Sequence, residues 1–239
     1  VIAEGRATGV QIRRHQRVET ISANAEVILS AGAIGSPQLL MLSGIGAGGE
    51  LSAHGIEVLS DLPGVGKNLQ DHLQARPVFK TTLSTVNTEI NSYLKKGLTA
   101  AKYAFTQRGP MTMAASLGTG FLKTEAHLET PDIQFHIQPW SASKPSDGPH
   151  KFSAFTASVL QLRPESAGHL TLSSANIDDH PEIHPNYLST DTDCRTIVKG
   201  IQIARRIAQS EPLKSHITEE YAPGVGVALE DEVATLDWA

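Results

Sequence analysis

A continuous apolar run that ends at a glycine and leads straight into a helix signal is the strongest constraint on this fold. Residues 26–31 read Glu-Val-Ile-Leu-Ser-Ala, and Gly32 follows them. An apolar run without alternation predicts a strand covered on both faces, as in an open α/β sheet. A helix is then predicted from Ser36-Pro37, which suit a helix start, to Gly44, which suits a helix end. Sheets of this kind bind phosphates and cofactors at such junctions, although many junctions are only structural.

The pattern of apolar and polar residues changes near residue 75. Before it, residues 10–18 alternate apolar and polar side chains around a polar stretch at 14–17, which predicts a half-exposed β-hairpin. After it, alternation with period two predicts antiparallel strands with one apolar and one polar face, at 132–138, 152–162 and 169–172. We therefore expect an α/β part followed by an antiparallel part.

Two amphipathic helices are predicted after residue 75. The first carries apolar side chains at helical spacing from Ile90 to Phe105 and is ended by Gly109-Pro110. The second runs from about Asp193 to Gln209. Its predicted inward side chains are Ile197, Ile201, Ala204 and Ile207. The chain closes inside another helical pattern at residues 236–239.

Composition and charge argue against several function classes. The chain is 40% hydrophobic and 19% charged, with a net charge of −5, so disorder is not expected. No Lys/Arg cluster stands out, and binding to nucleic acid or to anionic lipid is therefore not expected. No apolar run approaches the roughly 18 to 20 residues of a membrane-spanning helix. The single cysteine, Cys194, excludes an internal disulfide framework and a cysteine-rich zinc site.

Other motif-like features favour ordinary structural interpretations. Residues 44–49 have the spacing G-x-G-x-x-G but follow a predicted helix rather than a strand, so they are interpreted as a helix end and turn. His180 and His184 have the spacing of helical metal ligands, but Pro181 breaks that helix, and we predict a solvated turn and no metal site. Cys194 is interpreted as inert.

The polar face of residues 134–138 stays open to two interpretations. Gln134, His136 and Gln138 alternate with apolar residues, and Trp140 follows them. Exposure to solvent is the default for such a face, and the alternative is that it lines a cavity.

Four segments of the chain resemble a known family. Residues 27–46, Val-Ile-Leu-Ser-Ala-Gly-Ala-Ile-Gly-Ser-Pro-Gln-Leu-Leu-Met-Leu-Ser-Gly-Ile-Gly, closely resemble the second signature of the glucose–methanol–choline (GMC) flavoprotein oxidoreductases. The likeness continues through Asp-Leu-Pro-Gly-Val-Gly-Lys-Asn-Leu-Gln-Asp-His at 61–72 and returns at 168–172 and 185–189. It therefore covers nearly the whole chain in the family's order.

The resemblance implies an α/β FAD-binding portion and an α+β substrate domain with an antiparallel sheet and flanking helices. On this basis residues 1–74 are part of the FAD-binding domain, 75–215 form the substrate-binding domain, and 216–239 begin the return to the FAD-binding domain. The implied cofactor is FAD. The implied reaction is the oxidation of a primary or other neutral alcohol, in which hydride passes to the flavin N5 and a histidine near the family's C-terminus assists removal of the hydroxyl proton.

The resemblance carries over to a few cofactor-binding residues. Ala31 and Gly32 match the family's segment that returns to the FAD, where small residues let the backbone approach the cofactor. Asn68 and Asp71 match the connector beside the flavin domain, where a structural role is at least as well supported as contact with FAD.

The expected substrate is an uncharged alcohol. Choline-oxidising relatives have a glutamate about where Leu117 stands, and a carboxylate is the group that would pair with a trimethylammonium. Met113, Leu117, Gln138 and Trp140 are the predicted pocket residues, and each is equally well placed to be core. The resemblance leaves open which alcohol is used and which acceptor reoxidises the flavin.

Two family features have no match in this sequence, namely the N-terminal G-x-G-x-x-G and the C-terminal segment with the catalytic histidine. No catalytic residue is therefore assigned. The chain opens at Val1 without methionine, and we expect it to be the central piece of a longer cytoplasmic enzyme, colourless and inactive when purified alone. Peripheral attachment to a membrane is left open. The alternative is a non-catalytic binding or interaction module that keeps the GMC scaffold.

Overall fold

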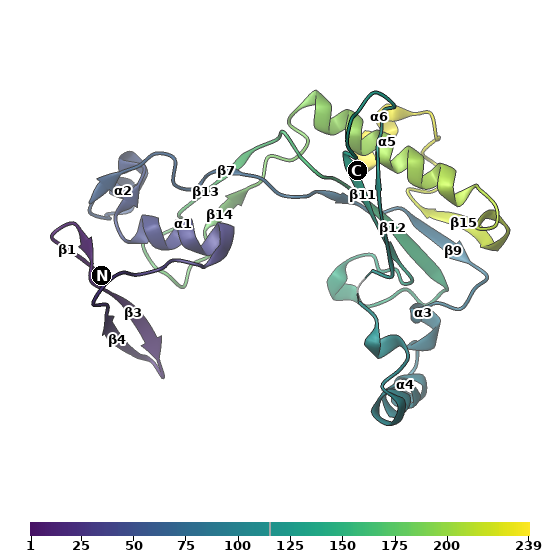
Figure 1. Ribbon diagram of the computed structural model, residues 1–239, viewed down its shortest axis with the longest axis horizontal. Coiled ribbons are helices and arrows are strands. Elements are labelled where there is room, and N and C mark those ends of the chain that lie inside the picture. The colour runs from purple at the N-terminus through teal and green to yellow at the C-terminus, as the bar shows by residue number, and fades with distance from the viewer. Residues whose placement is uncertain (115) are drawn as a thin grey trace. The chain divides into compact units, whose positions relative to one another are not determined.

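The computed structural model describes residues 1–114 and 116–239, apart from the side chain of residue 145. The chain forms two compact units, each built from two stretches of sequence (Figure 1). Unit 1 contains Val1–Asp71 and Ser166–Tyr187, and unit 2 contains His72–Glu165 and Leu188–Ala239. These units are defined by which segments pack together. The assignment of residues 1–74 and 216–239 to an FAD-binding domain and of 75–215 to a substrate-binding domain stays a prediction. The α/β class with an antiparallel part is confirmed.

Unit 1 opens with two small antiparallel pairs. β1 (Ile2–Ala3) pairs with β2 (Arg6–Ala7), and β3 (Gly9–Arg14) pairs with β4 (Arg17–Ser22). The second pair confirms the predicted hairpin, whose turn places His15 and Gln16 at positive φ, but every residue of β4 is exposed, so the hairpin is more exposed than predicted. A hydrogen-bonded ion pair of 2.6 Å joins Arg13 of this hairpin to Asp178.

The rest of unit 1 is a small α/β assembly. Its elements are α1 (Gly32–Leu42), β5 (Ile45–Gly46), α2 (Gly48–Ala53), β6 (Ser60–Asp61), β7 (Lys67–Leu69), β13 (Gly168–Thr171) and β14 (Glu182–His184). The three last strands form one antiparallel sheet in the order β14-β13-β7, whereas β5 and β6 form a parallel pair. Met41, Leu51 and Leu172 make a small apolar core between these elements.

The predicted buried strand at 26–32 is wrong. Residues 26–31 pair with no strand in the described part of the chain, and Ile28 is 75% exposed. A strand exists only where neighbouring strands satisfy its backbone groups, and an apolar β-branched run shows the tendency without supplying the partners.

Helix α1 also begins earlier than expected, at Gly32 rather than at Ser36. The hydroxyl of Ser36 lies inside the helix and accepts a hydrogen bond of 3.0 Å from the amide of Ala31. Ser36 therefore stabilises the start of the helix from a position inside it, about one turn after the N-cap residue Ala31. The helix ends as predicted, because Gly44 takes a φ of +84°.

Close backbone contact at Gly66 fixes β13 against the connector that carries β7. Gly66 has a φ of +79°, and a Cβ on it would lie 2.7 Å from the carbonyl oxygen of Leu170. The amide of Leu170 donates to the oxygen of Gly66 at 2.7 Å. Only glycine meets both demands without moving the strand.

Replacing Gly66 by alanine should destabilise unit 1. We expect Gly66→Ala to lower the free energy of unfolding by about 1 to 3 kcal/mol, because the new methyl group meets Leu170 and the left-handed backbone is strained. Gly64→Ala is the matched control, since a Cβ at Gly64 meets nothing within 4 Å. Urea unfolding measures the free energy of unfolding of both variants. An equal loss in the two would contradict this account.

Unit 2 is built on a six-stranded antiparallel sheet. The strand order is β10-β11-β12-β9-β15, and β8 also pairs with β12. The strands are β8 (Gln74–Ala75), β9 (Val78–Thr81), β10 (Gly118–Leu122), β11 (Ile133–Gln138), β12 (Ala154–Gln161) and β15 (Ile217–Ala222). The period-two predictions for β11, β12 and β13 are confirmed, with β13 lying in unit 1.

Helix α5 (Asp191–Ala208) covers one face of this sheet. Thr190 caps it by accepting from the amide of Asp193 at 3.3 Å, and Arg205 and Arg206 lie in its last turn, where cations are favourable. The core residues are Phe79, Ile133, Phe135, Val159, Ile197 and Ile201. Ile197, Ile201 and Ala204 are buried as predicted, and Ile207 also faces the sheet, although it is 45% exposed because it borders a cavity there.

The remaining helices are short, except for α4 with 14 residues. They are α3 (Val86–Glu89), α4 (Tyr93–Thr106), α6 (Glu232–Trp238) and the 3₁₀ turns η1 (Pro110–Thr112), η2 (Pro145–Asp147) and η3 (Lys214–His216). The helix predicted from Ile90 to Phe105 is α4 and begins three residues later, at Tyr93, because Ile90 is the C-cap of α3 and Ser92 caps α4. Among the described residues, no helix has the length and apolar character needed to cross a membrane.

Candidate functional site

The segments that carry the family resemblance come together in unit 1. Residues 27–46 contain α1, residues 61–72 contain β7, and residues 168–172 contain β13, which pairs with β7. The fourth segment joins them through two side chains. Asn186 donates to the oxygen of Ala167 at 3.2 Å, and the Tyr187 hydroxyl donates to the carboxylate of Asp71. Segments scattered over the sequence thus form one structural unit.

A groove of about 440 Å³ lies between the start of α1 and the β7 connector. Its lining residues are Ala33, Pro37, Gly66, Lys67, Asn68, Leu69, Gln70 and Leu170. It therefore brings the predicted cofactor residue Asn68 close to the helix turn that begins with Ala31 and Gly32. Asp71 is not among the lining residues.

The start of α1 gives this groove a positive end. Ala31 stands at the N-cap and supplies no side-chain cap, and the first turn carries no acidic residue. The first amides of a helix have no partner inside the helix, and they carry the positive end of its dipole. Gly32 has a φ of +76° and open space where a Cβ would stand. A group with phosphates, such as FAD, fits this arrangement of donors and free space.

Asp71 has a structural partner instead. Its hydrogen bond from Tyr187, with burial and the Asp71 charge adding to the effect, raises the pKa of Tyr187 to about 12. This hydrogen bond thereby fixes the segment after β14, which carries Tyr187, against the segment after β7, which carries Asp71.

The Tyr187–Asp71 pair predicts a late step in the alkaline titration of the chain. Because the folded-state pKa of Tyr187 is raised from 10.0 to about 12, the pair stabilises the fold below pH 10, and this contribution is lost as the pH rises through 12. A spectrophotometric titration of the tyrosines should lose its last step in Tyr187→Phe. The control Tyr93→Phe, which removes a phenol from α4, should keep that step, and a titration unchanged by Tyr187→Phe would contradict the pairing.

The glycines at 44–49 are used differently. Gly44 ends α1 as predicted, and α2 then begins at Gly48. The amide of Gly48 donates to Oδ1 of Asp61 at 2.9 Å. A carboxylate of the chain itself therefore occupies the place that a phosphate would need, which argues against dinucleotide binding there.

In unit 2, one face of the sheet packs on α5 and the other carries polar side chains. His136 lies opposite Ser158, and Gln138 lies opposite Thr156. The guanidinium of Arg76 joins two predicted pocket residues, because Nη2 donates to Oε1 of Gln138 at 3.2 Å and its carbon lies 5.9 Å from the centre of the Trp140 ring. The structure therefore brings Gln138 and Trp140 together.

Leu117 lies next to this pair, and Met113 is not linked to it. The amide of Leu117 donates to the oxygen of Ile137 at 2.9 Å, which sets it beside Gln138. Met113 instead donates through its amide to the oxygen of Pro110 at 3.2 Å. The site role of all four residues stays a prediction.

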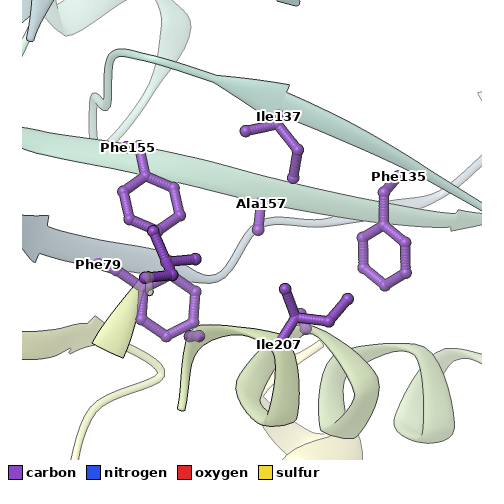
Figure 2. Close-up of a pocket in the computed structure, with 9 residues that line it drawn as sticks. Phe79, Phe135, Ile137, Phe155, Ala157 and Ile207 are labelled. Atoms are coloured by element: carbon purple, nitrogen blue, oxygen red, sulfur yellow. The ribbon is translucent and has the colours of Figure 1, made fainter. Parts of the chain in front are cut away.

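An apolar cavity of about 220 Å³ lies on the opposite face of the sheet, against α5 (Figure 2). Its lining residues are Phe79, Phe135, Ile137, Phe155, Ala157, Ala204, Ile207, Ala208 and Leu213. The predicted pocket residues are absent from this lining. The cavity is thus a separate feature of the sheet–helix interface.

Other reactive side chains have local partners. His150 lies between the hydroxyls of Ser141 and Ser143 at 2.9 and 3.0 Å, and burial, together with the charge of Lys80, lowers the pKa of His150. The thiol of Cys194 contacts the oxygen of Leu188 at 3.2 Å. The histidine and carboxylate side chains of the described residues form no group of three that could hold a metal.

Sequence reasoning missed Ala33, Arg76 and Ser158. Arg76 lies between β8 and β9 in a stretch without alternation, so no sequence pattern would have placed it beside Gln138. The Ser158 hydroxyl is buried on the polar face without a partner among the described residues, and no sequence pattern reveals this.

Comparison with known proteins agrees with the arrangement in unit 1. The model of the GMC oxidoreductase N-terminal part matches residues 1–74, and the model of the C-terminal part matches residues 164–237. This chain belongs to the GMC oxidoreductase family. The two matched ranges include all four segments that carry the resemblance, so the recognition from sequence is confirmed.

Curated relatives of this GMC chain include dehydrogenases of alcohols and of choline. It is 39% identical over 228 residues to an alcohol dehydrogenase [acceptor] of Pseudomonas putida, covering 94% of this chain and 41% of that protein. It is 36% identical over 235 residues to an oxygen-dependent choline dehydrogenase of Brucella anthropi, covering 98% of this chain and 43% of that protein. The chain therefore spans less than half the length of these relatives.

Solved structures show the same fold. A formate oxidase matches with a TM-score of 0.86 and 25% identity, covering 98% of this chain and 46% of that one. A formate oxidase of Aspergillus oryzae, described in terms of FAD modification, matches with a TM-score of 0.82 and 26% identity over the same shares of the two chains. FAD is thus the cofactor of the family to which this chain belongs.

Proposed function

We propose that this chain is part of an FAD-dependent oxidoreductase that oxidises the CH–OH group of an alcohol. The observation that carries the proposal is the groove at the uncapped start of α1, where segments typical of the family meet. The family membership of the chain and the names of its relatives support the reaction class. The acceptor for the electrons stays open.

Residues of unit 1 would hold the cofactor. The first amides of α1, reached past Ala31 and Gly32, offer hydrogen bonds and positive potential to a phosphate, and Asn68 lines the facing wall. Asp71 contributes by fixing this wall through Tyr187. When bound, FAD supplies the hydride acceptor. No residue of this chain is assigned as the base that takes the hydroxyl proton.

A negative charge at Ala33 should reduce flavin binding without harming the fold. Ala33 is exposed in the first turn of α1, where an acidic residue favours the helix but repels phosphates in the groove. We expect Ala33→Glu in the complete protein to lower its flavin content severalfold, while the melting temperature of the flavin-free protein stays unchanged. Ala33→Gln is the control of similar size, and flavin content equal in both variants would contradict the proposed site.

If the complete protein binds no flavin, the alternative of a non-catalytic module remains. A complete protein that never binds flavin, in any variant, would be an interaction module on the GMC scaffold. The expectation that the 239-residue chain alone is colourless and inactive is part of the same proposal.

The polar face of unit 2 supports a neutral alcohol as substrate. Arg76 places a positive charge between Gln138 and Trp140, and Leu117 beside them offers no carboxylate. A quaternary ammonium would meet repulsion from the guanidinium and no opposite charge at Leu117. The same composition accommodates an uncharged hydroxyl compound.

The complete enzyme should show a higher kcat/KM for a neutral primary alcohol than for choline. Leu117→Glu should shift this ratio toward choline by roughly fivefold to tenfold, the effect of one partly exposed charge pair. Leu117→Gln changes the size of the side chain in the same way without the charge and should leave the ratio unchanged. A parent enzyme that prefers choline would contradict the substrate proposal.

We also propose a cytoplasmic location for the complete protein. The single cysteine supports it, because secreted proteins that depend on disulfides use several.

A further inference from the structure

Helix α4 turns its apolar side chains away from the unit to which it belongs. Leu94, Leu98, Ala101 and Phe105 repeat at helical spacing and form one stripe, and all four are exposed. Leu94 is 74% exposed and Phe105 is 88% exposed. None of the residues of this helix is buried.

The side of α4 that meets the protein is the polar one. Only Thr99 and Tyr103 are half-buried, and they lie about 150° around the helix from the centre of the apolar stripe at 100° per residue. A surface helix of a globular domain normally packs its apolar stripe on the core. This helix is therefore inverted, and its apolar stripe has no partner among the described residues.

The exposed apolar surface extends beyond the helix. Its first residue, Tyr93, is 92% exposed, and η1, which packs against α4, adds the exposed Met111. Figure 1 shows α4 at the margin of unit 2, next to α3 and away from α5. We call Tyr93, Leu94, Leu98, Phe105 and Met111 the α4 surface.

The segment that carries the α4 surface has positive charges only, and the nearest acidic side chain in sequence is the exposed Glu89 of α3. Between Glu89 and Glu125 the sequence has no acidic residue, although the whole chain carries a net charge of −5. The same stretch contains Lys95, Lys96, Lys102 and Arg108, all exposed. Lys95 and Lys102 flank the apolar stripe, where long side chains can lay their methylenes on the surface and extend their charges beyond it.

We propose that the α4 surface binds a membrane with anionic lipids, lying in the plane of the headgroups. Exposed Leu and Phe side chains flanked by lysines are the composition of helices that lie in this interface, where apolar burial and attraction to acidic headgroups add. The helix has 14 residues, about 21 Å, enough to present the whole stripe at once. The proposal is independent of the proposed catalytic function and revises the expectation that anionic lipid is not bound.

Vesicle co-sedimentation of the full chain tests the proposal. We expect the chain to bind vesicles of phosphatidylcholine with about a third phosphatidylserine, to bind vesicles of phosphatidylcholine alone at least tenfold more weakly, and to be released by salt. Phe105→Glu should weaken binding to the anionic vesicles more than tenfold. The control Val225→Glu makes the same change at a position that is 96% exposed in a loop far along the chain, and it should bind like the parent.

The positive charges are tested separately. Lys95→Gln with Lys102→Gln should weaken binding roughly 20- to 30-fold, about fivefold for each lysine near an acidic surface. The matched control, Lys151→Gln with Lys214→Gln, removes two exposed lysines outside the α4 surface and should have no effect. Circular dichroism should show the same fold in all variants, since every changed residue is exposed.

Several outcomes would overturn the proposal. They are an absence of binding to either vesicle, equal binding to both, and a Phe105→Glu variant that binds like its parent. A fourth is a parent chain that sediments as a dimer without binding vesicles and becomes monomeric in Phe105→Glu, because the α4 surface would then join two copies of the chain.

Discussion

The pairing of β7 with β13 holds unit 1 together and positions everything that the candidate site needs. The two strands are about 100 residues apart in the sequence, and closing such a long connection has an entropic cost that tight local contact must offset. Gly66 allows this contact, because a Cβ there would lie 2.7 Å from the carbonyl oxygen of Leu170. Gly168 allows β13 to approach β14 in the same way, because a Cβ there would lie 1.9 Å from the oxygen of His184. With the strands this close, the connector at Asn68 faces the start of α1, and the groove for a cofactor exists.

Unit 2 uses its sheet in two ways, and alternation along the strands separates them. Residues such as Phe135 and Ile137 point toward α5 and enclose the cavity of Figure 2. Their neighbours Gln138 and His136 point to the other face, where Arg76 provides the positive charge. A strand with period two gives both faces from one stretch of sequence, so packing and recognition do not compete for the same residues.

Much of this structure could be predicted because local pattern and tertiary environment agree. The strand at 132–138 and helix α5 follow from periodicity, since each has a partner that covers its apolar side. The hairpin at 10–18 forms because its two strands pair with each other, although the apolar side chains of β4 stay exposed. The strand expected at 26–32 failed because the described chain supplies it with no neighbour. Periodicity identified the apolar stripe of α4 correctly but could not show that it faces outward, because a helix looks the same in sequence whichever way it is turned.

The candidate site shows the same division. The sequence by itself determined the family, the small residues at Ala31 and Gly32, and the glycines of the connector, because each is written in a short run of residues whose conformational demands are local. Only the tertiary structure decided that Asn68 shares a groove with the start of α1, that Asp71 is held by Tyr187, and that Arg76 joins Gln138 to Trp140. These relations depend on contacts between distant segments, and such contacts arise from the packing of the whole unit rather than from any local pattern.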